Sequence, residues 1–255
     1  MTAYPEHRVA LVTGAGRGIG RAVAQRLSRD GYRVALSARN ESDLSETASA
    51  CPGETLVLPA DITAADAADR VLGGIEETWG PVDVLVANAG AGTSASLART
   101  TDAQWEHMLD LNLTAPFRCI RRAVPGMVER GFGRIVVVAS VAAKAGEPYI
   151  CAYTASKHGV LGLVRSAAAE LASSGVTVNA VCPGYVETPM TESTVAGIVE
   201  KTGRTREEAR TALERKQPIG RLVNADEVAQ AVAFCVANGA VNGQGVNIDG
   251  GAVQS

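Results

Sequence analysis

Continuous apolar runs rich in β-branched residues recur along the chain and alternate with longer segments of helical periodicity. The run at residues 135–138, Ile-Val-Val-Val, is apolar at every position, whereas a strand with one face in water alternates apolar and polar residues. A strand that is apolar on both faces requires helices on both sides of a parallel sheet. We expect such strands at residues 8–13, 32–37, 55–59, 82–87, 134–140, 176–181 and 245–248. The pattern predicts an α/β fold with a doubly wound, parallel, seven-stranded sheet and helices on both faces.

The segments between these runs repeat apolar residues at spacings of three and four, as amphipathic helices do. They lie at residues 18–30, 43–50, 64–79, 101–130, 153–173 and 226–236. No linker, charge block or repeat interrupts the alternation, so we expect a single domain over residues 1–255. Residues 187–221 do not follow this alternation of strands and helices. This polar, helix-prone insertion is typical of mobile segments that contact a substrate, and we expect a substrate lid there.

Composition excludes several classes of partner and site. The 255 residues contain 24 Lys and Arg against 27 Asp and Glu, a net charge of −3, so no basic field attracts nucleic acid or an anionic membrane. The five cysteines are scattered and form no C-x-x-C pair, which argues against a disulfide framework or a zinc site. Residues 1–10 lack a targeting pattern, and no run of about 18 apolar residues occurs. We expect a cytoplasmic protein with no metal, no nucleic-acid partner and no membrane association.

A glycine-rich turn directly follows the first expected strand and opens the first expected helix. Its spacing is G-x-x-x-G-x-G, with Gly14, Gly18 and Gly20 at the spaced positions. A glycine turn that leads into a helix N-terminus offers free backbone N–H groups to a pyrophosphate, and side chains there would block the approach. An ordinary strand-to-helix turn is the alternative. The position of the loop favours a dinucleotide site in the first half of the chain, as in a Rossmann fold.

The end of the second expected strand indicates which dinucleotide is preferred. Enzymes that bind NAD usually carry an acid there for the ribose 2′-hydroxyl, whereas arginine accommodates the 2′-phosphate of NADP. Here the strand ends in Ser37-Ala38-Arg39, with no carboxylate before Glu41, and Arg17 lies in the glycine loop. Unless both arginines are solvated surface charges, they predict that NADP(H) is preferred over NAD(H).

Three polar residues in the second half have the chemistry for proton transfer to a carbonyl oxygen. Tyr153 and Lys157 are four residues apart at the start of an expected helix, so their side chains project from one face. An ammonium group there is expected to lower the pKa of the phenol from about 10 toward neutrality. Ser140, at the end of the fifth expected strand, can hydrogen-bond the same oxygen. Each residue alone is more often a surface or capping residue, but together with the glycine loop they predict a catalytic site.

The ordered series of these motifs resembles the short-chain dehydrogenase/reductase family over nearly the whole chain. The family's common N-N-A-G is here Ala87-Asn88-Ala89-Gly90, and the second Asn is retained. The matching segments are TGAGRGIG (13–20), Asp61, NAG (88–90), Asn112 in LNLTAPF, Ser140, YTASK (153–157), NAVCPGYVETPM (179–190) and NIDGG (247–251). Within the family, the chain is most similar to 3-oxoacyl thioester reductases and aromatic polyketide ketoreductases. The segments that carry this similarity are the one around Tyr153, residues 179–190 and PIGR (218–221).

The resemblance implies a role for each matched residue. Tyr153 is the implied general acid, which protonates the carbonyl oxygen as hydride arrives from the nicotinamide. Lys157 binds the nicotinamide ribose and lowers the pKa of Tyr153, and Ser140 orients the carbonyl. Asn112 would hold a water in a proton relay from Lys157 to solvent. The implied cofactor-binding residues are Thr13, Gly14, Gly16, Arg17, Gly18, Ile19, Gly20, Arg39, Asp61, Ile62, Asn88, Ala89, Gly90, Tyr153, Lys157, Pro183, Gly184, Val186 and Thr188.

The function expected from this resemblance is NADPH-dependent reduction of a ketone to a secondary alcohol. The expected substrate is a 3-oxoacyl thioester of acyl carrier protein or CoA, or a polyketide-like ketone. An NAD-linked dehydrogenase that oxidises a secondary alcohol or a 3-hydroxyacyl-CoA is the alternative, and a catalytically inactive dinucleotide-binding sensor is a remote one. Family members form dimers of dimers, which implies a homotetramer.

Several other polar residues have competing interpretations. His107 and His158 are the other candidate acids, but their expected helix positions place them away from the strand ends, and we interpret both as structural. Cys151 lacks a His partner that would activate it and is interpreted as a loop cysteine. Residues that could hold the phosphate of phosphopantetheine or CoA are Arg121, Arg122, Arg130, Lys201, Arg204, Arg206 and Arg210. For those in the expected lid, which alternate with glutamates, a solvated helix face is the simpler interpretation.

Overall fold

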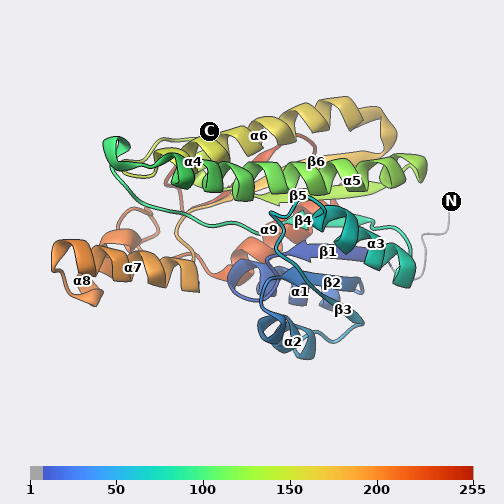
Figure 1. Ribbon diagram of the computed structural model, residues 1–255, viewed down its shortest axis with the longest axis horizontal. Coiled ribbons are helices and arrows are strands. Elements are labelled where there is room, and N and C mark those ends of the chain that lie inside the picture. The colour runs from blue at the N-terminus through green and yellow to red at the C-terminus, as the bar shows by residue number, and fades with distance from the viewer. Residues whose placement is uncertain (1–7, 255) are drawn as a thin grey trace.

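A seven-stranded parallel sheet forms the middle of the structure, a computed structural model that describes residues 8–254 (Figure 1). The strand order is β3-β2-β1-β4-β5-β6-β7. The strands are β1 (Val9–Thr13), β2 (Arg33–Ala38), β3 (Thr55–Pro59), β4 (Val84–Ala87), β5 (Gly133–Val138), β6 (Val176–Pro183) and β7 (Gly245–Ile248). All seven expected strands are present, and the predicted fold class is confirmed. The expectation that residues 1–10 carry no targeting pattern falls mainly on residues 1–7, outside the described part of the chain.

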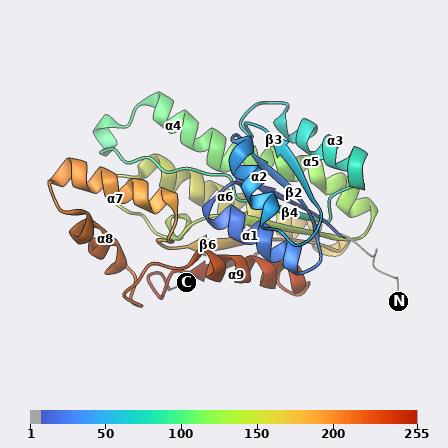
Figure 2. The same ribbon diagram turned by 90° about the horizontal axis from the view of Figure 1, so that it is seen from below.

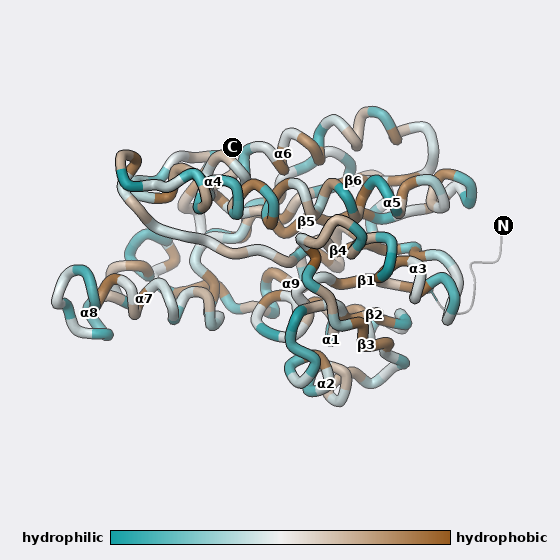
Figure 3. The backbone as a smooth tube through the Cα atoms, viewed as in Figure 1, coloured by the Kyte–Doolittle hydropathy of each residue, from teal (hydrophilic) through white to brown (hydrophobic). Residues whose placement is uncertain are grey.

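Helices cover both faces of the sheet, as the continuous apolar strands require. One face packs against α1 (Gly18–Arg29), α2 (Glu41–Ser49) and α9 (Ala225–Ala237), and the other against α3 (Ala67–Trp79), α5 (Ala115–Glu129) and α6 (Cys151–Leu171). Each side has its own hydrophobic core, and every residue of β1, β4 and β6 is buried between the two. Figure 3 shows the strands as the most apolar part of the chain, with polar residues on the outer sides of the helices. No helix within residues 8–254 is long and apolar enough to cross a bilayer.

The sheet reverses its winding direction at β1, which pairs with β2 on one side and with β4 on the other. In doubly wound sheets the crevice for a ligand opens at this point, beyond the carboxyl ends of the strands. β1 ends at Thr13 and β4 ends at Ala87. The glycine loop and the segment beginning at Asn88 therefore leave the sheet side by side.

The long helix expected over residues 101–130 is interrupted in the structure. It consists of α4 (Asp102–Leu109), a π-helical turn over Asp110–Thr114, and α5. The π-turn inserts extra backbone into the helix, so the prediction of one regular helix was wrong at its centre. Single π-turns inside α-helices occur frequently at functional sites, and this one contains Asn112.

The insertion at residues 187–221 forms two helices that project from one end of the sheet, as Figure 2 shows. They are α7 (Pro189–Thr202) and α8 (Arg206–Glu214). A small apolar cluster separate from the two main cores holds them together through Val195, Ala209, Leu213 and Leu222.

We predict that truncating a side chain in the sheet core destabilises the protein far more than truncating an exposed one. Leu85 in β4 is fully buried, whereas Leu97 is 78% exposed. Leu85→Ala should lower the free energy of unfolding by about 2–5 kcal/mol, because it loses apolar burial and leaves a cavity. Leu97→Ala should change it by less than about 0.5 kcal/mol. Urea denaturation measures both, and equal losses in the two variants would contradict the assigned core.

Candidate active site

The glycine loop between β1 and α1 leaves no room for side chains. Gly14 has a φ of +66°, and a β-carbon there would lie 2.8 Å from the side-chain nitrogen of Asn88. A β-carbon on Gly20 would collide with the carbonyl oxygen of Gly14. Arg17 precedes α1 and makes no side-chain capping hydrogen bond to its first turn. The loop is therefore packed closely against Asn88, and the first backbone N–H groups of α1 have no side-chain cap from Arg17.

Asn88 ties this loop to the end of β4. Its side-chain amide donates to the carbonyl oxygens of Thr13, at 2.9 Å, and Gly14, at 3.2 Å. In return, the hydroxyl oxygen of Thr13 accepts from the backbone N–H groups of Asn88, at 3.0 Å, and Ala89, at 3.1 Å. The two strand ends are thus joined by side-chain hydrogen bonds beyond the last pairing of the sheet.

Arg17, Arg39 and Asp61 lie on the same rim, beyond β1, β2 and β3. Both arginines are exposed. Hydrogen bonds from Thr63 lower the pKa of the Asp61 carboxyl, and the positive charge of Arg39 lowers it further. Neither arginine is buried against an acid, so both guanidinium groups can contact a phosphate at this rim.

The segment that follows β6 closes the opposite side of the glycine loop. A β-carbon on Gly18 would lie 3.2 Å from the methyl group of Thr188, so the two segments are in close contact. Thr188 caps α7, where its hydroxyl oxygen accepts from the N–H of Thr191. Val186 is buried and is fixed by a bridge to Val223. Residues 183–188 thereby approach the glycine loop from the second half of the chain.

Ser140, Tyr153 and Lys157 converge beyond β5. The side chain of Ser140 lies close enough to Tyr153 to influence its pKa, and its Oγ accepts from the N–H of Ala142 at 3.1 Å. Lys157 is buried, with only 4% of its surface exposed, and its Nζ donates to the carbonyl oxygen of Val138 at 3.0 Å. The same Nζ lies 5.6 Å from the centre of the Tyr153 ring. A carbonyl oxygen placed against Ser140 would meet the hydroxyl of Tyr153.

The pKa shifts at this site differ from the expectation for Tyr153. Burial raises the pKa of Tyr153, and the neighbouring Ser140 only partly opposes this effect, so the predicted lowering is wrong in this structure. The pKa that is lowered is that of the lysine, because burial brings the pKa of Lys157 to about 8. The physical reason is that both groups share a desolvated pocket, which disfavours the phenolate and the ammonium alike.

Asn112 and Lys157 both lie near Gly90. The amide of Asn112 makes a two-way contact with the backbone of Ala91, accepting from N–H at 3.3 Å and donating to the carbonyl at 3.0 Å. A β-carbon on Gly90 would meet both the side-chain oxygen of Asn112, at 2.9 Å, and the Nζ of Lys157, at 3.5 Å. The π-turn thus places a buried amide oxygen next to the buried amine.

Comparisons with known proteins agree with this geometry. The family model described as short chain dehydrogenase matches residues 8–198. The chain belongs to the short-chain dehydrogenase/reductase family. A crystal structure of a variant actinorhodin polyketide ketoreductase with NADPH has a TM-score of 0.93 and 39% identity, and covers 98% of this chain and 99% of that chain. The 3-oxoacyl-(acyl-carrier-protein) reductase MabA of Mycobacterium tuberculosis is 38% identical, over 96% of this chain and 92% of the relative. D-beta-hydroxybutyrate dehydrogenase of Rhizobium meliloti is 33% identical, over 96% and 98%.

The remaining polar residues of this short-chain dehydrogenase/reductase lie away from the site or contact the segments that support it. His107 and His158 are exposed on α4 and α6. Cys151 is the first residue of α6, which corrects its interpretation as a loop residue, and its sulfur lies 3.4 Å from the hydroxyl of Thr100. Sequence reasoning missed Cys182, whose buried thiol lies close enough to the backbone of Ser140 for it to influence the pKa of the thiol. No pattern in the sequence signals that contact, because it depends on the pairing of β5 with β6.

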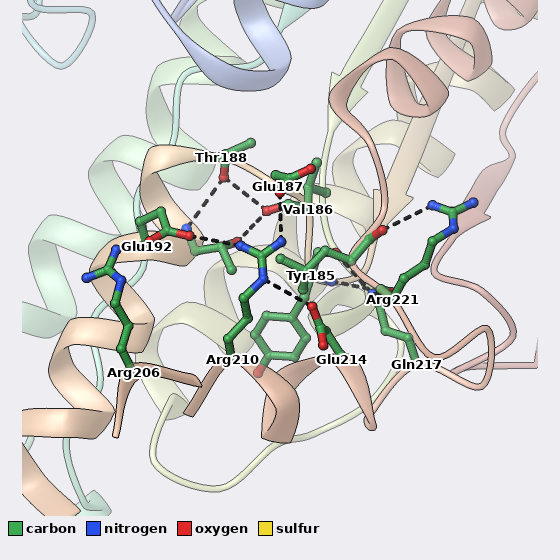
Figure 4. Close-up of polar contacts among 12 residues, drawn as sticks. Tyr185, Val186, Glu187, Thr188, Glu192, Arg206, Arg210, Glu214, Gln217 and Arg221 are labelled. Carbon is green, nitrogen blue, oxygen red and sulfur yellow. Dashed lines mark hydrogen bonds and ion pairs between the residues drawn. The ribbon is translucent and has the colours of Figure 1, made fainter. Parts of the chain in front are cut away.

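Most of the expected basic patch is neutralised by nearby acids. Arg122 pairs with Glu76 and Asp69, and Arg130 with Asp83. Figure 4 shows Arg210 of α8 reaching Glu187, Glu192 and Glu214, and Glu192 also pairs with Arg206. Arg121 instead lies over the ring of Phe117 at 5.1 Å, and Lys201 donates to the carbonyl of Ser94 at 3.3 Å. The arginines of α8 are therefore paired with acidic side chains and do not form an open basic surface.

We predict that the buried amine of Lys157 makes stability depend on pH. Its pKa is about 8 in the folded chain, against an ordinary value of 10.5 for a lysine in water. Between these values the unfolded chain holds the proton and the folded chain does not, so stability rises with pH. The free energy of unfolding of the wild type, minus that of Lys157→Met, should increase by about 3 kcal/mol from about pH 7 to about pH 10.5.

Urea unfolding without cofactor at the two pH values measures this difference. Lys201→Met, which removes an exposed lysine, is the control and should follow the wild type at both. A difference that stays constant with pH would show that the Lys157 amine is not desolvated.

Proposed function

We propose that the protein reduces a ketone to a secondary alcohol with NADPH, and that Tyr153 donates the proton to the carbonyl oxygen. The observation that carries the proposal is the grouping of Ser140, Tyr153 and buried Lys157 in one pocket, on the same sheet edge as the glycine loop. The cofactor, when bound, supplies hydride to the carbonyl carbon. The chain positions the substrate, stabilises charge on its oxygen and provides the proton.

The cofactor-binding residues divide into three groups around the cleft. We propose that Thr13, Gly14, Gly16, Gly18, Ile19 and Gly20 hold the pyrophosphate, with Arg17 and Arg39 at the 2′-phosphate. Asp61, Ile62, Asn88, Ala89 and Gly90 line the adenine and ribose. Pro183, Gly184, Val186 and Thr188 hold the nicotinamide side together with Tyr153 and Lys157. The close contact of Gly18 with Thr188 supports a single continuous site.

The protonation states favour proton donation by Tyr153. Because the pKa of Tyr153 is raised, its hydroxyl stays protonated at neutral pH and can donate to the substrate oxygen. Ser140 holds that oxygen through a hydrogen bond. Lys157, with a pKa of about 8, can exchange a proton close to neutral pH and so restore the phenol. Asn112, beside the Lys157 amine, would hold a water that connects it to solvent.

The substrate class rests on the relatives. The similarity to an actinorhodin polyketide ketoreductase and to a 3-oxoacyl-(acyl-carrier-protein) reductase supports a 3-oxoacyl thioester or a polyketide-like ketone. We propose that α7 and α8, within residues 187–221, form the lid over this substrate in a single domain of residues 1–255. The paired arginines on and next to α5 and on α8 give little support to carrier-protein docking through the expected patch, so a CoA thioester fits equally well.

A second function has one observation in its favour. The relation to D-beta-hydroxybutyrate dehydrogenase supports oxidation of a hydroxyl group. The alternative function is that of an NAD-linked enzyme that oxidises a secondary alcohol or 3-hydroxyacyl-CoA. The exposed Arg17 and Arg39, with no acid at the end of β2, favour NADP(H) instead. The presence of Ser140, Tyr153 and Lys157 in one pocket argues against an inactive dinucleotide sensor.

We also propose that the protein is a cytoplasmic homotetramer. Trp105 on α4 and Phe117 on α5 are 41% and 40% exposed, and Phe234 on α9 is 48% exposed. Large apolar side chains on helix surfaces of this kind are typical of subunit contacts. Static light scattering measures the mass in solution, and a monomer would contradict the assembly.

Tyr153→Phe should lower ketone reduction sharply and weaken NADPH binding only slightly, because it removes a single hydroxyl. Loss of the general acid is expected to lower kcat with acetoacetyl-CoA by about 100- to 10,000-fold. NADPH oxidation at 340 nm measures turnover, and NADPH fluorescence measures binding. Tyr32→Phe, at the opposite edge of the sheet before β2, is the control and should retain full activity. Turnover by Tyr153→Phe at the wild-type rate would refute the assigned proton donor.

Arg39→Ala should weaken the binding of NADPH more than the binding of NADH. A charge-assisted hydrogen bond to the 2′-phosphate contributes about 1.5–3 kcal/mol, so KM for NADPH should rise roughly 10- to 100-fold while KM for NADH stays nearly constant. Arg26→Ala, which removes a residue paired with Asp30 at the far end of α1, is the control. If the wild type prefers NADH, or if Arg39→Ala affects both cofactors equally, the NADP assignment fails.

A further inference from the structure

The segment between Ser140 and Tyr153 is held in a constrained conformation. Within it, residues 144–150, which we call the catalytic loop, connect the short helical turn after Ser140 to α6. Tyr149 has a φ of +69°, a left-handed conformation that costs a non-glycine residue about 1–2 kcal/mol. Such a conformation persists only where surrounding contacts fix the backbone. The loop must therefore be anchored from outside.

Two of its anchors come from neighbouring segments. The carbonyl oxygen of Tyr149 accepts from the N–H of Ala95 at 2.8 Å. At the other end of the loop, the Nζ of Lys144 donates to the carbonyl oxygen of Gly245 in β7 at 2.6 Å. Neither contact reaches the α7–α8 segment.

The third anchor is the side chain of Glu147. The hydroxyl of Tyr185 donates to both carboxylate oxygens, at 3.0 and 3.2 Å, and the Nζ of Lys216 forms an ion pair with the same carboxylate. Lys216 also donates to the hydroxyl oxygen of Tyr185 at 3.4 Å. We call these three residues the clasp. They come from the catalytic loop, the segment after β6, and the chain just beyond α8.

Each partner of Glu147 is itself fixed. Gln217, buried next to Lys216, accepts from the N–H of Tyr185 at 2.9 Å and donates to its carbonyl oxygen at 3.1 Å. In Figure 4 the ring of Tyr185 extends away from Thr188 while Gln217 contacts its backbone. The hydroxyl end of Tyr185 is held by Glu147 and Lys216, and its backbone end by Gln217. The clasp is thus part of a continuous polar connection from the catalytic loop to the base of α8.

The charges within the clasp support one arrangement of donors. Burial and the neighbouring Glu147 raise the pKa of Tyr185, so its hydroxyl stays protonated and donates to the carboxylate. Burial lowers the pKa of Lys216, but the contacts with Glu147 and Tyr185 outweigh it and leave the pKa raised. An exposed ion pair alone contributes little to stability. Here two donors share one carboxylate, and the side chain of Glu147 is only 33% exposed.

We propose that Glu147 is a positioning residue: through Tyr185 and Lys216 it holds the catalytic loop against the base of the α7–α8 segment, and so keeps the substrate cleft formed before substrate arrives. Glu147 lies six residues before Tyr153, and Tyr185 is close enough to affect the pKa of Tyr153. The effect on substrate binding rests on the proposed reductase function. The coupling of the catalytic loop to the α7–α8 segment does not depend on that function.

Hydrogen–deuterium exchange of the full chain without cofactor tests the coupling. Glu147→Gln removes the charge at nearly constant size, Tyr185→Phe removes only the hydroxyl, and Lys216→Met removes the ammonium. Each should speed exchange in peptides covering residues 144–150 and 206–217 by threefold or more, while α1 exchanges as in the wild type. Arg70→Met, which breaks the exposed pair with Asp66 in α3, is the matched control. Wild-type exchange in both segments of all three clasp variants would overturn the proposal.

Steady-state kinetics with NADPH and acetoacetyl-CoA tests the consequence for the reaction. The clasp variants should raise KM for the ketone fivefold or more and change kcat less than twofold, because binding is affected and not the chemical step. The double variant Glu147→Gln/Lys216→Met should resemble the worse single variant if the residues act as a unit. An unchanged KM would overturn the positioning role. If the wild type turned over no ketone, the proposed function would fail, and the exchange result would still decide the coupling.

Discussion

Hydrogen bonds to the carbonyl groups at the strand ends hold the two halves of the site together. Parallel strands leave these carbonyls without sheet partners where the strands stop, and two side chains supply the missing donors. Asn88 donates to Thr13 and Gly14 beyond β1, and Lys157 donates to Val138 at the end of β5. Because the donors are themselves the residues nearest the cleft, the same contacts that complete the sheet edge also place the polar groups of the site.

Burial of Lys157 determines the electrostatics that follow. An amine held against a carbonyl in a desolvated pocket has its pKa lowered to about 8, and the phenol of Tyr153 in the same pocket has its pKa raised. Desolvation disfavours both charged forms, so Tyr153 stays a neutral phenol and Lys157 gives up its proton more readily than an exposed lysine does. This arrangement suits donation of a proton from Tyr153 and its replacement through Lys157.

Most of the fold could be predicted from sequence because the apolar runs and helical periods are local signals. The features that escaped prediction depend on contacts between distant segments. The π-turn at Asn112 coincides with the two-way contact to Ala91, which no helical period reveals. The raised pKa of Tyr153 depends on how tightly the pocket closes. The pairing of Arg122 with Glu76 and of Glu147 with Lys216 joins residues 46 and 69 positions apart, and motif spacing says nothing about such pairs.

We propose that three parts of the chain form a single dinucleotide cleft at one edge of the sheet: the glycine loop, the segment after β6 and the Tyr153 pocket. A crystal structure of the protein with NADPH tests it most directly. We expect the pyrophosphate at the N-terminus of α1, the 2′-phosphate near Arg17 and Arg39, and the nicotinamide between Thr188 and Tyr153. A cofactor bound elsewhere, or a nicotinamide that points away from Tyr153, would contradict the account.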